Sequence, residues 1–302
     1  MKYLLLLCSM MLLNGTWAPA QISRETVNYF QDLKMDIYQR DDLDEQPVLL
    51  FVHGGGFTGG NRDSGDIESL AMRLADEMTV VSISYRLTMV GKGFGCDVKA
   101  GDKLQAFASA SLDAARATLY LINNAADLRI NPEKIILAGS SAGAETVLHL
   151  AYWKDASTFD GRSVLPPGFR YAGVISLAGA LIDDQLITSE NSMPTMLVHG
   201  TCDNLVPYDY APHHYCDKGL PGYLMLHGGA SIARRLDYLA RPYYLITICG
   251  GDHDWATISI REMHDEMLDF IRQDVLGGRK RSLHEWVSGS HNCNYPEAGI
   301  CK

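Results

Sequence analysis

The sequence predicts an α/β fold, in which a mostly parallel, doubly wound sheet is flanked by helices. Two observations lead to this prediction. Continuously apolar runs, such as VLLFV at 48–52, have the pattern of strands that are covered on both faces. They alternate with amphipathic stretches, and the longest of these, at 103–123, places apolar side chains from Leu104 to Ile122 on one stripe.

The elements follow from local patterns along the chain. LKMDIY at 33–38 alternates as a half-buried strand does, whereas the later strands are short apolar runs. Strands are expected at 33–38, 48–52, 79–84, 134–138, 174–177, 196–198 and 244–248. Apolar residues at helical spacing predict helices at 67–77, 103–123, 142–153, 232–240 and 258–275. Irregular stretches at 87–101 and 201–227 leave the carboxyl ends of strands, where open sheets bind ligands, so both are expected to frame a site.

Composition is that of an ordinary globular protein. The chain has 302 residues, of which 47% are hydrophobic and 21% charged. The formal net charge is −10 and the longest basic run is Arg279-Lys280-Arg281, so no nucleic-acid partner is expected. No apolar run is long enough to predict a transmembrane segment. One catalytic domain is expected over 21–276, with a short tail over 277–302, and the oligomeric state is left open.

The first twenty residues have the features of a secretory signal peptide. Lys2 precedes an apolar core at 4–13, and Ala18-Pro19-Ala20 is similar to a cleavage site. Cleavage near Ala20 would yield a secreted or periplasmic protein. A lipoprotein anchored through Cys8 is the alternative.

The remaining six of the seven cysteines are Cys96, Cys202, Cys216, Cys249, Cys293 and Cys301. An even number in an exported protein predicts disulfides, and buried free thiols are the alternative. Cys293 and Cys301 flank NYPEAG, whose Pro and Gly favour a turn that joins them. Cys202 can bridge to Cys216 or to Cys249, and either bridge would brace the loop of Asp203. No Cys or His spacing indicates a metal site.

A serine bracketed by glycines lies at a predicted strand-to-helix junction. GSSAG at 139–143 follows the strand KIILA and opens a helix. A nucleophile elbow needs this context, because a sharp turn lifts the serine hydroxyl above the sheet and glycines leave room where a Cβ would clash. Ser141 is therefore the predicted nucleophile, and Ser140 is its neighbour in the motif.

A second glycine cluster, HGGGF at 53–57, follows the run VLLFV. Three glycines let bare backbone N–H groups approach a ligand, as an acyl-transfer enzyme requires for the developing oxyanion. A plain glycine turn is the alternative. We expect the two glycine clusters to form the two halves of one site.

With these motifs the chain resembles the α/β-hydrolase fold esterases and lipases, particularly the HGGG-bearing carboxylesterases and the bacterial acetyl-xylan and feruloyl esterases. The resemblance covers nearly all of the chain after residue 20. It implies the α/β-hydrolase fold. Relatives usually form a cap from a long N-terminal extension or an insertion after the sixth strand, and this chain has only short segments before VLLFV and between Leu177 and Pro194, so little or no cap domain is expected. The resemblance also implies that Gly55, Gly56 and the N–H of Ala142 form the oxyanion hole, and that His53 is structural.

The resemblance further implies an acid and a base that follow the serine in that order. The segment MLVHGTCDNLVP offers Asp203 as the acid, with Asp183 and Asp184 as rivals, and CGGDHDW offers His253 as the base. His199 is expected to pack or cap the acid loop. Surface positions are expected for His213 and His214, with pocket walls as the alternative. HGG at 227–229 precedes a helix and is not expected to take part.

The expected substrate is a short-acyl or polysaccharide-linked ester, such as an acetyl or feruloyl ester, because little of the chain is available for a lid. Phe57, Tyr208 and Trp255 are candidate pocket walls, with core packing as the alternative. Triad chemistry needs no metal and no organic cofactor. An amide-directed hydrolase, such as a peptidase or formamidase, and a non-enzymatic binding protein on the same fold are the alternative functions.

Overall fold

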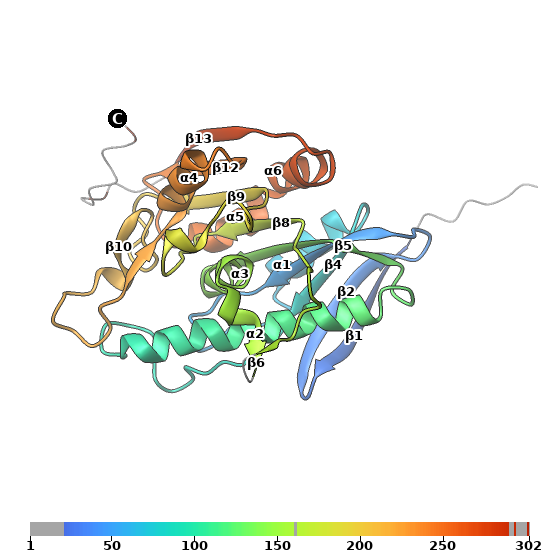
Figure 1. Ribbon diagram of the computed structural model, residues 1–302, viewed down its shortest axis with the longest axis horizontal. Helices are drawn as coiled ribbons and strands as arrows, with labels where there is room; N and C mark the ends of the chain where they lie inside the picture. The colour runs from blue at the N-terminus through green and yellow to red at the C-terminus, as the bar shows by residue number, and fades with distance from the viewer. Residues whose placement is uncertain (1–20, 160–161, 290–292, 294–300, 302) are drawn as a thin grey trace, which may run out of the picture.

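A nine-stranded sheet forms the centre of the molecule (Figure 1). The computed structural model describes residues 21–159, 162–289, 293 and 301, so the predicted leader at 1–20 lies outside the described residues. In sheet order the strands are β1 (Ile22–Phe30), β2 (Leu33–Arg40), β4 (Thr79–Ile83), β3 (Gln46–Val52), β5 (Ile130–Ser140), β8 (Gly173–Leu177), β9 (Thr195–Gly200), β12 (Tyr243–Cys249) and β13 (Ser282–Ser288).

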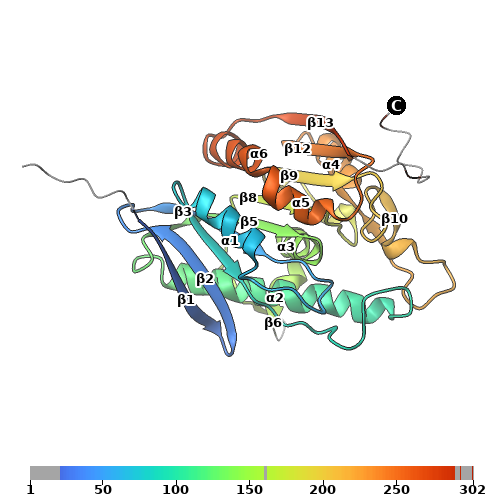
Figure 2. The same cartoon turned by 180° about the vertical axis from the view of Figure 1, so that it is seen from behind.

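The pairs β1–β2 and β2–β4 are antiparallel, and the other neighbouring strands are parallel. Helices cover both faces. One face carries α2 (Ala100–Asn123), α3 (Ala142–Tyr152) and α4 (Gly229–Tyr238), and the other carries α1 (Gly65–Leu74), α5 (Trp255–Glu262) and α6 (His264–Asp269), as Figures 1 and 2 show. The predicted mostly parallel, doubly wound architecture is confirmed.

Each face of the sheet has its own hydrophobic core. In β3, Val48 and Leu50 pack into the core beneath α2, α3 and α4, whereas Leu49 and Phe51 pack into the core beneath α1, α5 and α6. Successive strand residues point to opposite faces, so a strand covered on both sides is apolar at every position. This packing explains the unbroken apolar runs in the sequence.

The two edge strands were absent from the elements expected from the sequence. β1 has mostly exposed or half-buried residues and pairs with β2 alone. β13 also lies at an edge, parallel to β12, and none of its residues is buried. An edge strand buries little surface and therefore lacks a strong apolar pattern. The sheet consequently extends to residue 288, past the boundary expected at 276.

The single helix expected at 258–275 is wrong. Met263, with φ −107° and ψ 23°, ends α5, and α6 is followed by a π-helical segment, η4 (Phe270–Leu276). The break lets both Met263 and Met267 enter the core beneath the sheet. No helix in the described part of the chain is apolar over a length that would cross a bilayer.

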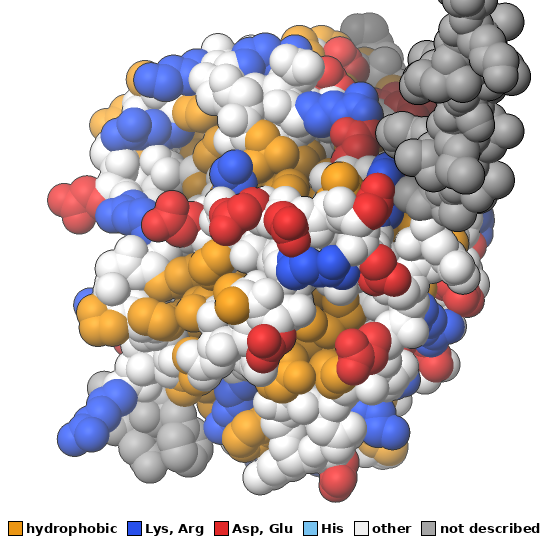
Figure 3. All heavy atoms as spheres, turned by 90° about the vertical axis from the view of Figure 1, so that its right-hand side faces the viewer, with side chains coloured by type: hydrophobic (Ala, Val, Ile, Leu, Met, Phe, Trp, Pro, Cys, Tyr) orange, Lys and Arg blue, Asp and Glu red, His pale blue; other side chains and the backbone are white. Residues whose placement is uncertain are grey.

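Three disulfides join the six cysteines: Cys96–Cys216, Cys202–Cys293 and Cys249–Cys301. Disulfide bonding is confirmed, but the expected Cys293–Cys301 bridge and both expected partners of Cys202 are wrong. The physical reason is β13: it runs parallel to β12, so the chain beyond it returns to the edge of the sheet where Cys202 and Cys249 lie. On the face of the molecule shown in Figure 3, acidic and basic side chains lie interspersed around small apolar areas.

Candidate active site

Ser141 occupies a strained turn between β5 and α3. Its φ of 51° and ψ of −123° lie outside the helical and extended regions, which a non-glycine residue rarely leaves. A Cβ on Gly139 would lie 2.3 Å from the carbonyl oxygen of Gly143, and one on Gly143 would lie 2.0 Å from that of Val52. Both positions therefore require glycine, and they hold the turn against β3.

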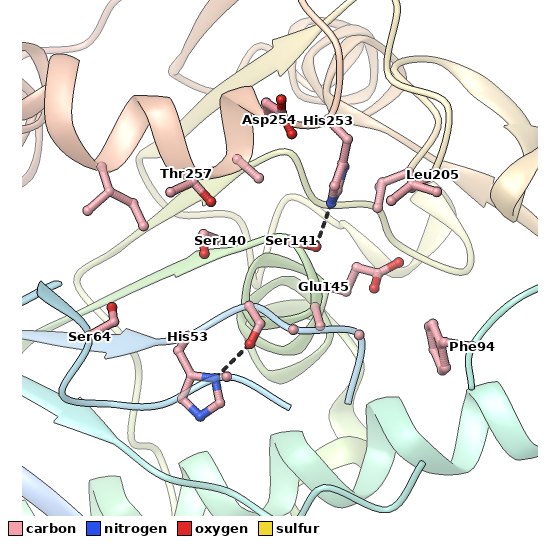
Figure 4. A pocket seen from close by; sticks show the side chains of 18 of the residues that line it. His53, Ser64, Phe94, Ser140, Ser141, Glu145, Leu205, His253, Asp254 and Thr257 are labelled. Atoms are coloured by element: carbon pink, nitrogen blue, oxygen red, sulfur yellow. Dashed lines mark hydrogen bonds between the residues drawn. The ribbon is translucent and has the colours of Figure 1, made fainter. Parts of the chain in front are cut away.

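A continuous hydrogen-bonded chain links the three residues predicted from the motifs. Oγ of Ser141 lies 2.8 Å from Nε2 of His253, and Nδ1 of His253 lies 2.8 Å from Oδ2 of Asp203. Figure 4 shows His253 pointing down onto Ser141 from the segment before α5. The residues follow β5, β9 and β12, whose carboxyl ends meet at one edge of the parallel sheet.

Asp203 is buried, and both oxygens of its carboxylate have hydrogen-bond partners. The backbone N–H groups of Leu205 and Val206 each donate to Oδ1 at 2.9 Å, and His199 Nε2 lies 3.4 Å from Oδ2. Burial by itself would raise the pKa of Asp203, but the hydrogen bonds from His199 and His253 outweigh it and hold the pKa well below its usual range. The carboxyl is therefore ionised at neutral pH.

The pKa of His253 shifts in the opposite direction. Burial disfavours its charged form, but the hydrogen bond and negative charge of Asp203 outweigh burial and raise the pKa of the imidazole. Since Nδ1 faces a carboxylate, it carries the proton, and Nε2 is free to accept the proton of Ser141. The arrangement suits proton transfer from the serine hydroxyl.

The glycine cluster at 53–57 lies against the serine. Gly54 is packed so closely on Ser141 that an added Cβ would lie 3.2 Å from the Cβ of Ser141. Gly55 and Gly56 have φ of 116° and 59°, which side-chain-bearing residues seldom adopt. Ala142 opens α3, where the first N–H groups of a helix have no partner within the helix. Gly55, Gly56 and Ala142 line one pocket together with Ser141.

His53 has a structural environment. Its ring is buried, stacks on Tyr85 at 4.5 Å between centroids, and has Nδ1 2.7 Å from the carbonyl oxygen of Gly54. Tyr85 also donates to the carbonyl oxygen of His53 at 3.0 Å. These contacts fix the direction in which the glycine cluster leaves β3.

The pocket has a volume of about 510 Å³ and extends to both sides of Ser141. In Figure 4, Thr257 and Ser64 lie on one side of Ser141, and Glu145 and Phe94 lie on the other. Phe94 belongs to the irregular stretch at 87–101, and Leu205 to that at 201–227. Both stretches frame the pocket, as the sequence predicted.

The three aromatic residues expected as pocket walls do not line this pocket. Phe57 is fully buried in the core, where it supports the ring of Phe94 at 4.9 Å between centroids. Tyr208 is buried and its hydroxyl lies 2.6 Å from Oγ1 of Thr247. Trp255 begins α5 and packs against the core beneath that helix. All three residues therefore pack in or against the core, which was the alternative to a place in the pocket wall.

Glu145, which lines the pocket, and Lys103 were not among the residues predicted for the site. His213 is buried, contrary to the expected surface position, and both it and His214 line the pocket. Burial lowers the pKa of His214 to about 4. Glu145 is the one carboxylate on α3 and stands four positions after the predicted nucleophile, which was a usable signal for it.

The rival acids lie elsewhere. Asp183 and Asp184 belong to the segment between β8 and β9 and do not line the pocket. Asp184 instead lies 3.3 Å from His227, whose Nδ1 is 2.8 Å from Oγ of Ser231. Ligand atoms of Asp183, Asp184 and His227 lie within 4.8 Å of one another, and this is the one such group of three found among the described residues; none of the three lines the pocket.

Part of the chain matches a known protein family. Residues 35–181 match the family model BD-FAE, and this segment contains both glycine motifs. The segment is similar to the BD-FAE family. The resemblance predicted from the two motifs is thereby confirmed. Asp203 and His253 lie beyond the matched segment.

Solved structures and a curated relative point to the same fold. Thermogutta terrifontis esterase 2 phosphoramylated by tabun is 19% identical, with a TM-score of 0.59 over 81% of this chain and 93% of that one. A candidate carboxylesterase from Lactobacillus plantarum is also 19% identical, with a TM-score of 0.60 over 84% and 98%. The chain therefore has the α/β-hydrolase fold. Acetylcholinesterase of Gallus gallus is 33% identical over 109 residues, which span 36% of this chain and only 14% of that enzyme.

Proposed function

We propose that the protein is a carboxylesterase-type serine hydrolase that acts through Ser141, His253 and Asp203. The observation that carries this proposal is the unbroken chain from the Ser141 hydroxyl through His253 to a buried, ionised carboxylate, with both links at 2.8 Å. The positioned glycine cluster and the similarity of residues 35–181 to the BD-FAE family support it. Esters are the substrates of the named structural neighbours.

The proposed reaction has two halves. Oγ of Ser141 attacks the ester carbonyl carbon while its proton passes to Nε2 of His253. The tetrahedral oxyanion accepts hydrogen bonds from the N–H groups of Gly55, Gly56 and Ala142. The alcohol leaves with the proton from His253, and the acyl group stays on Ser141. Water then gives a proton to His253 and attacks the acyl-enzyme, which releases the acid and restores Ser141.

Asp203 has a positioning and electrostatic role in this proposal. Its charge holds the His253 ring with Nδ1 protonated and stabilises the imidazolium that forms during each half-reaction. Because Leu205, Val206 and His199 engage the carboxylate, its position is set before substrate binds.

For the substrate, we propose short-acyl or polysaccharide-linked esters, such as acetyl or feruloyl esters. Support comes from the similarity to that family and from the butyrate-bound structure of Thermogutta terrifontis esterase 2, which is 20% identical with a TM-score of 0.57 over 81% of this chain and 93% of that one. We also propose an extracytoplasmic location, since three disulfides form and persist in oxidising compartments.

The test is covalent labelling followed by turnover. A fluorophosphonate probe is expected to label the purified protein at Ser141 and to leave Ser141→Ala unlabelled. Ser140→Ala, one residue away, is the matched control and should still be labelled. Ser141→Ala is expected to lose ester hydrolysis by at least about 10⁴-fold while remaining folded. Faster turnover of matched amides than of esters would contradict the ester assignment.

A further inference from the structure

Glu145 lies one helical turn after the proposed nucleophile and lines the same pocket. Its N–H donates to the carbonyl oxygen of Ser141 at 2.9 Å, which fixes it on the first turn of α3. Side chains on a helix lean toward the N-terminus, so a residue at this position projects back over the nucleophile. Figure 4 shows the Glu145 carboxyl beside Ser141, on the side that leads to Phe94.

The carboxyl is almost completely removed from solvent, at 1% exposure for the residue. His213 Nε2 lies 3.4 Å from Oε1, but its N–H is poorly aligned, and no residue in the described part of the chain completes a hydrogen bond to that oxygen. A buried polar atom without a partner costs about 1–3 kcal/mol. Glu145 thus presents an unsatisfied acceptor to the substrate pocket.

A buried lysine, Lys103, contacts the histidine that lies beside this carboxyl. Nζ of Lys103 lies 3.2 Å from Nδ1 of His213 and 3.2 Å from the carbonyl oxygen of Gly222. An ammonium has only donors, so Nδ1 of His213 accepts and its Nε2 carries the proton that faces Glu145. Burial raises the pKa of the Glu145 carboxyl well above its ordinary value, and the positive charge of Lys103 offsets only part of this effect.

We infer that Glu145 is a specificity-determining residue that accepts a hydrogen bond from a hydroxyl group of the substrate, close to the scissile ester bond. This inference rests on the proposed function and specifies its substrate class as hydroxyl-bearing esters. A substrate hydroxyl would satisfy Oε1, whereas an apolar group of the same size would leave it unpaired in a dry environment.

The surroundings favour a neutral hydroxyl over a cationic group. The positive charge of Lys103 already acts on Glu145, and a second cation here would be repelled by it. The pocket wall around Glu145 includes the ring of Phe94, which lies 5.2 Å from His213 between centroids, and the side chains of Leu205 and Val206. Cys96–Cys216 ties the loop of Phe94 to the loop of His213 and so fixes this wall.

The experiment uses isosteric ester pairs that differ by one hydroxyl. On the alcohol side the pair is 2-hydroxyethyl acetate and n-propyl acetate; on the acyl side it is ethyl 3-hydroxypropanoate and ethyl butanoate. Acid release gives kcat/KM for each, divided by the rate with hydroxide to remove intrinsic reactivity. If kcat/KM is higher for the hydroxyl member of only one pair, that pair identifies whether the recognised hydroxyl belongs to the alcohol or to the acyl group.

We expect the wild-type protein to prefer the hydroxyl member of one pair by about tenfold or more, because the other member leaves Oε1 of Glu145 buried and unpaired. Glu145→Leu should bring that ratio close to one. Glu145→Gln, which has nearly the same shape and keeps one acceptor oxygen, should lower the ratio, but less than Glu145→Leu does, and it keeps the test open if Glu145→Leu does not fold. Thr257→Val, a loss of a polar group on the opposite side of Ser141, should leave the ratio unchanged.

Two results would overturn the inference alone: hydrolysis of both pairs with no preference for a hydroxyl, or an unchanged ratio in a folded Glu145 variant. Absence of hydrolysis with every ester, together with absence of fluorophosphonate labelling, would instead overturn the proposed function and the inference with it.

Discussion

His199 Nε2 lies 3.4 Å from Oδ2 of Asp203, the same oxygen that lies 2.8 Å from Nδ1 of His253. Two imidazoles therefore share one carboxylate oxygen. His199 is buried in β9, and its Nδ1 accepts from the N–H of Gly229 at 3.4 Å, so its Nε2 carries a proton. That N–H lies between the carbonyl oxygen of Val206, 3.1 Å from Nε2, and Asp203. His199 packs within the acid loop and also contacts the acid itself.

Replacing His199 by Asn tests this contact, because the Asn oxygen can still accept from Gly229 while the donor to Asp203 is lost. We expect kcat/KM to fall by roughly tenfold, which corresponds to about 1.4 kcal/mol. With one donor fewer, more of the negative charge of Asp203 acts on His253, so the acid limb of the pH profile should move to higher pH. Lower activity with an unmoved limb would assign His199 a packing role only.

Asp203→Asn should reduce kcat/KM by roughly 10⁴-fold, because a neutral amide neither fixes the tautomer of His253 nor stabilises its charge. Asp184→Asn is the matched control, since Asp184 ends beside His227 and outside the pocket. It should retain activity close to that of the wild type. Activity lost in Asp184→Asn but kept in Asp203→Asn would move the catalytic acid to the segment between β8 and β9.

The pH dependence follows from the raised pKa of His253. A protonated imidazole cannot accept the serine proton, so activity falls as the pH decreases through this pKa. The inflection of kcat/KM on the acid side should therefore lie above about 6.5, the ordinary value for histidine. In Asp203→Asn the partner that raises the pKa is lost, and the inflection of the residual activity should move down. An inflection below 6 in the wild type would contradict the charge coupling.

Acyl-chain length tests how much of the substrate the pocket encloses. A tunnel that buried each added methylene would contribute about 0.8 kcal/mol per group, or roughly fourfold in kcat/KM. The segment between β8 and β9 contains only the short turn η2 (Asp184–Leu186), which offers little cover. We expect kcat/KM for nitrophenyl esters to be highest for short acyl groups. A steady rise from acetyl to decanoyl would indicate an enclosed acyl site.

The Cys202–Cys293 disulfide adjoins the acid in sequence, and both cysteines line a hollow beside His253. Replacing both by Ser should lower activity because the turn that carries Asp203 loses its covalent link to the C-terminal segment. Thermal unfolding gives the temperature at which each variant begins to unfold, and kcat/KM is measured below that temperature.

Cys249–Cys301 provides the matched control. In the chain-entropy model the two bridges, with separations of 91 and 52 residues, contribute about 4.6 and about 4.1 kcal/mol, so their removal should destabilise the protein to a similar extent. We expect the Cys202–Cys293 variant to lose more activity than the Cys249–Cys301 variant. Equal losses would mean that the bridges act through global stability only.

The sequence alone predicted the central strands and the turn of Ser141. Central strands are buried on both faces, so their apolar runs are continuous and easily recognised. The elbow is equally local, because Gly139 and Gly143 are required by contacts within a few residues of Ser141 and with the neighbouring strand β3. The edge strand β13 carried no such pattern, since none of its residues is buried.

The disulfide pairing and the composition of the pocket were decided by the tertiary structure. Cys202 and Cys293 meet only because β13 adds to the sheet beside β12, which no local pattern encodes. Likewise, Phe57 is an aromatic residue next to the oxyanion motif, yet its backbone directs it into the core, while Lys103, His213 and Glu145 come together from α2, a distant loop and α3. Short-range periodicity determines which face of an element is buried, whereas long-range packing determines which side chains meet at its end.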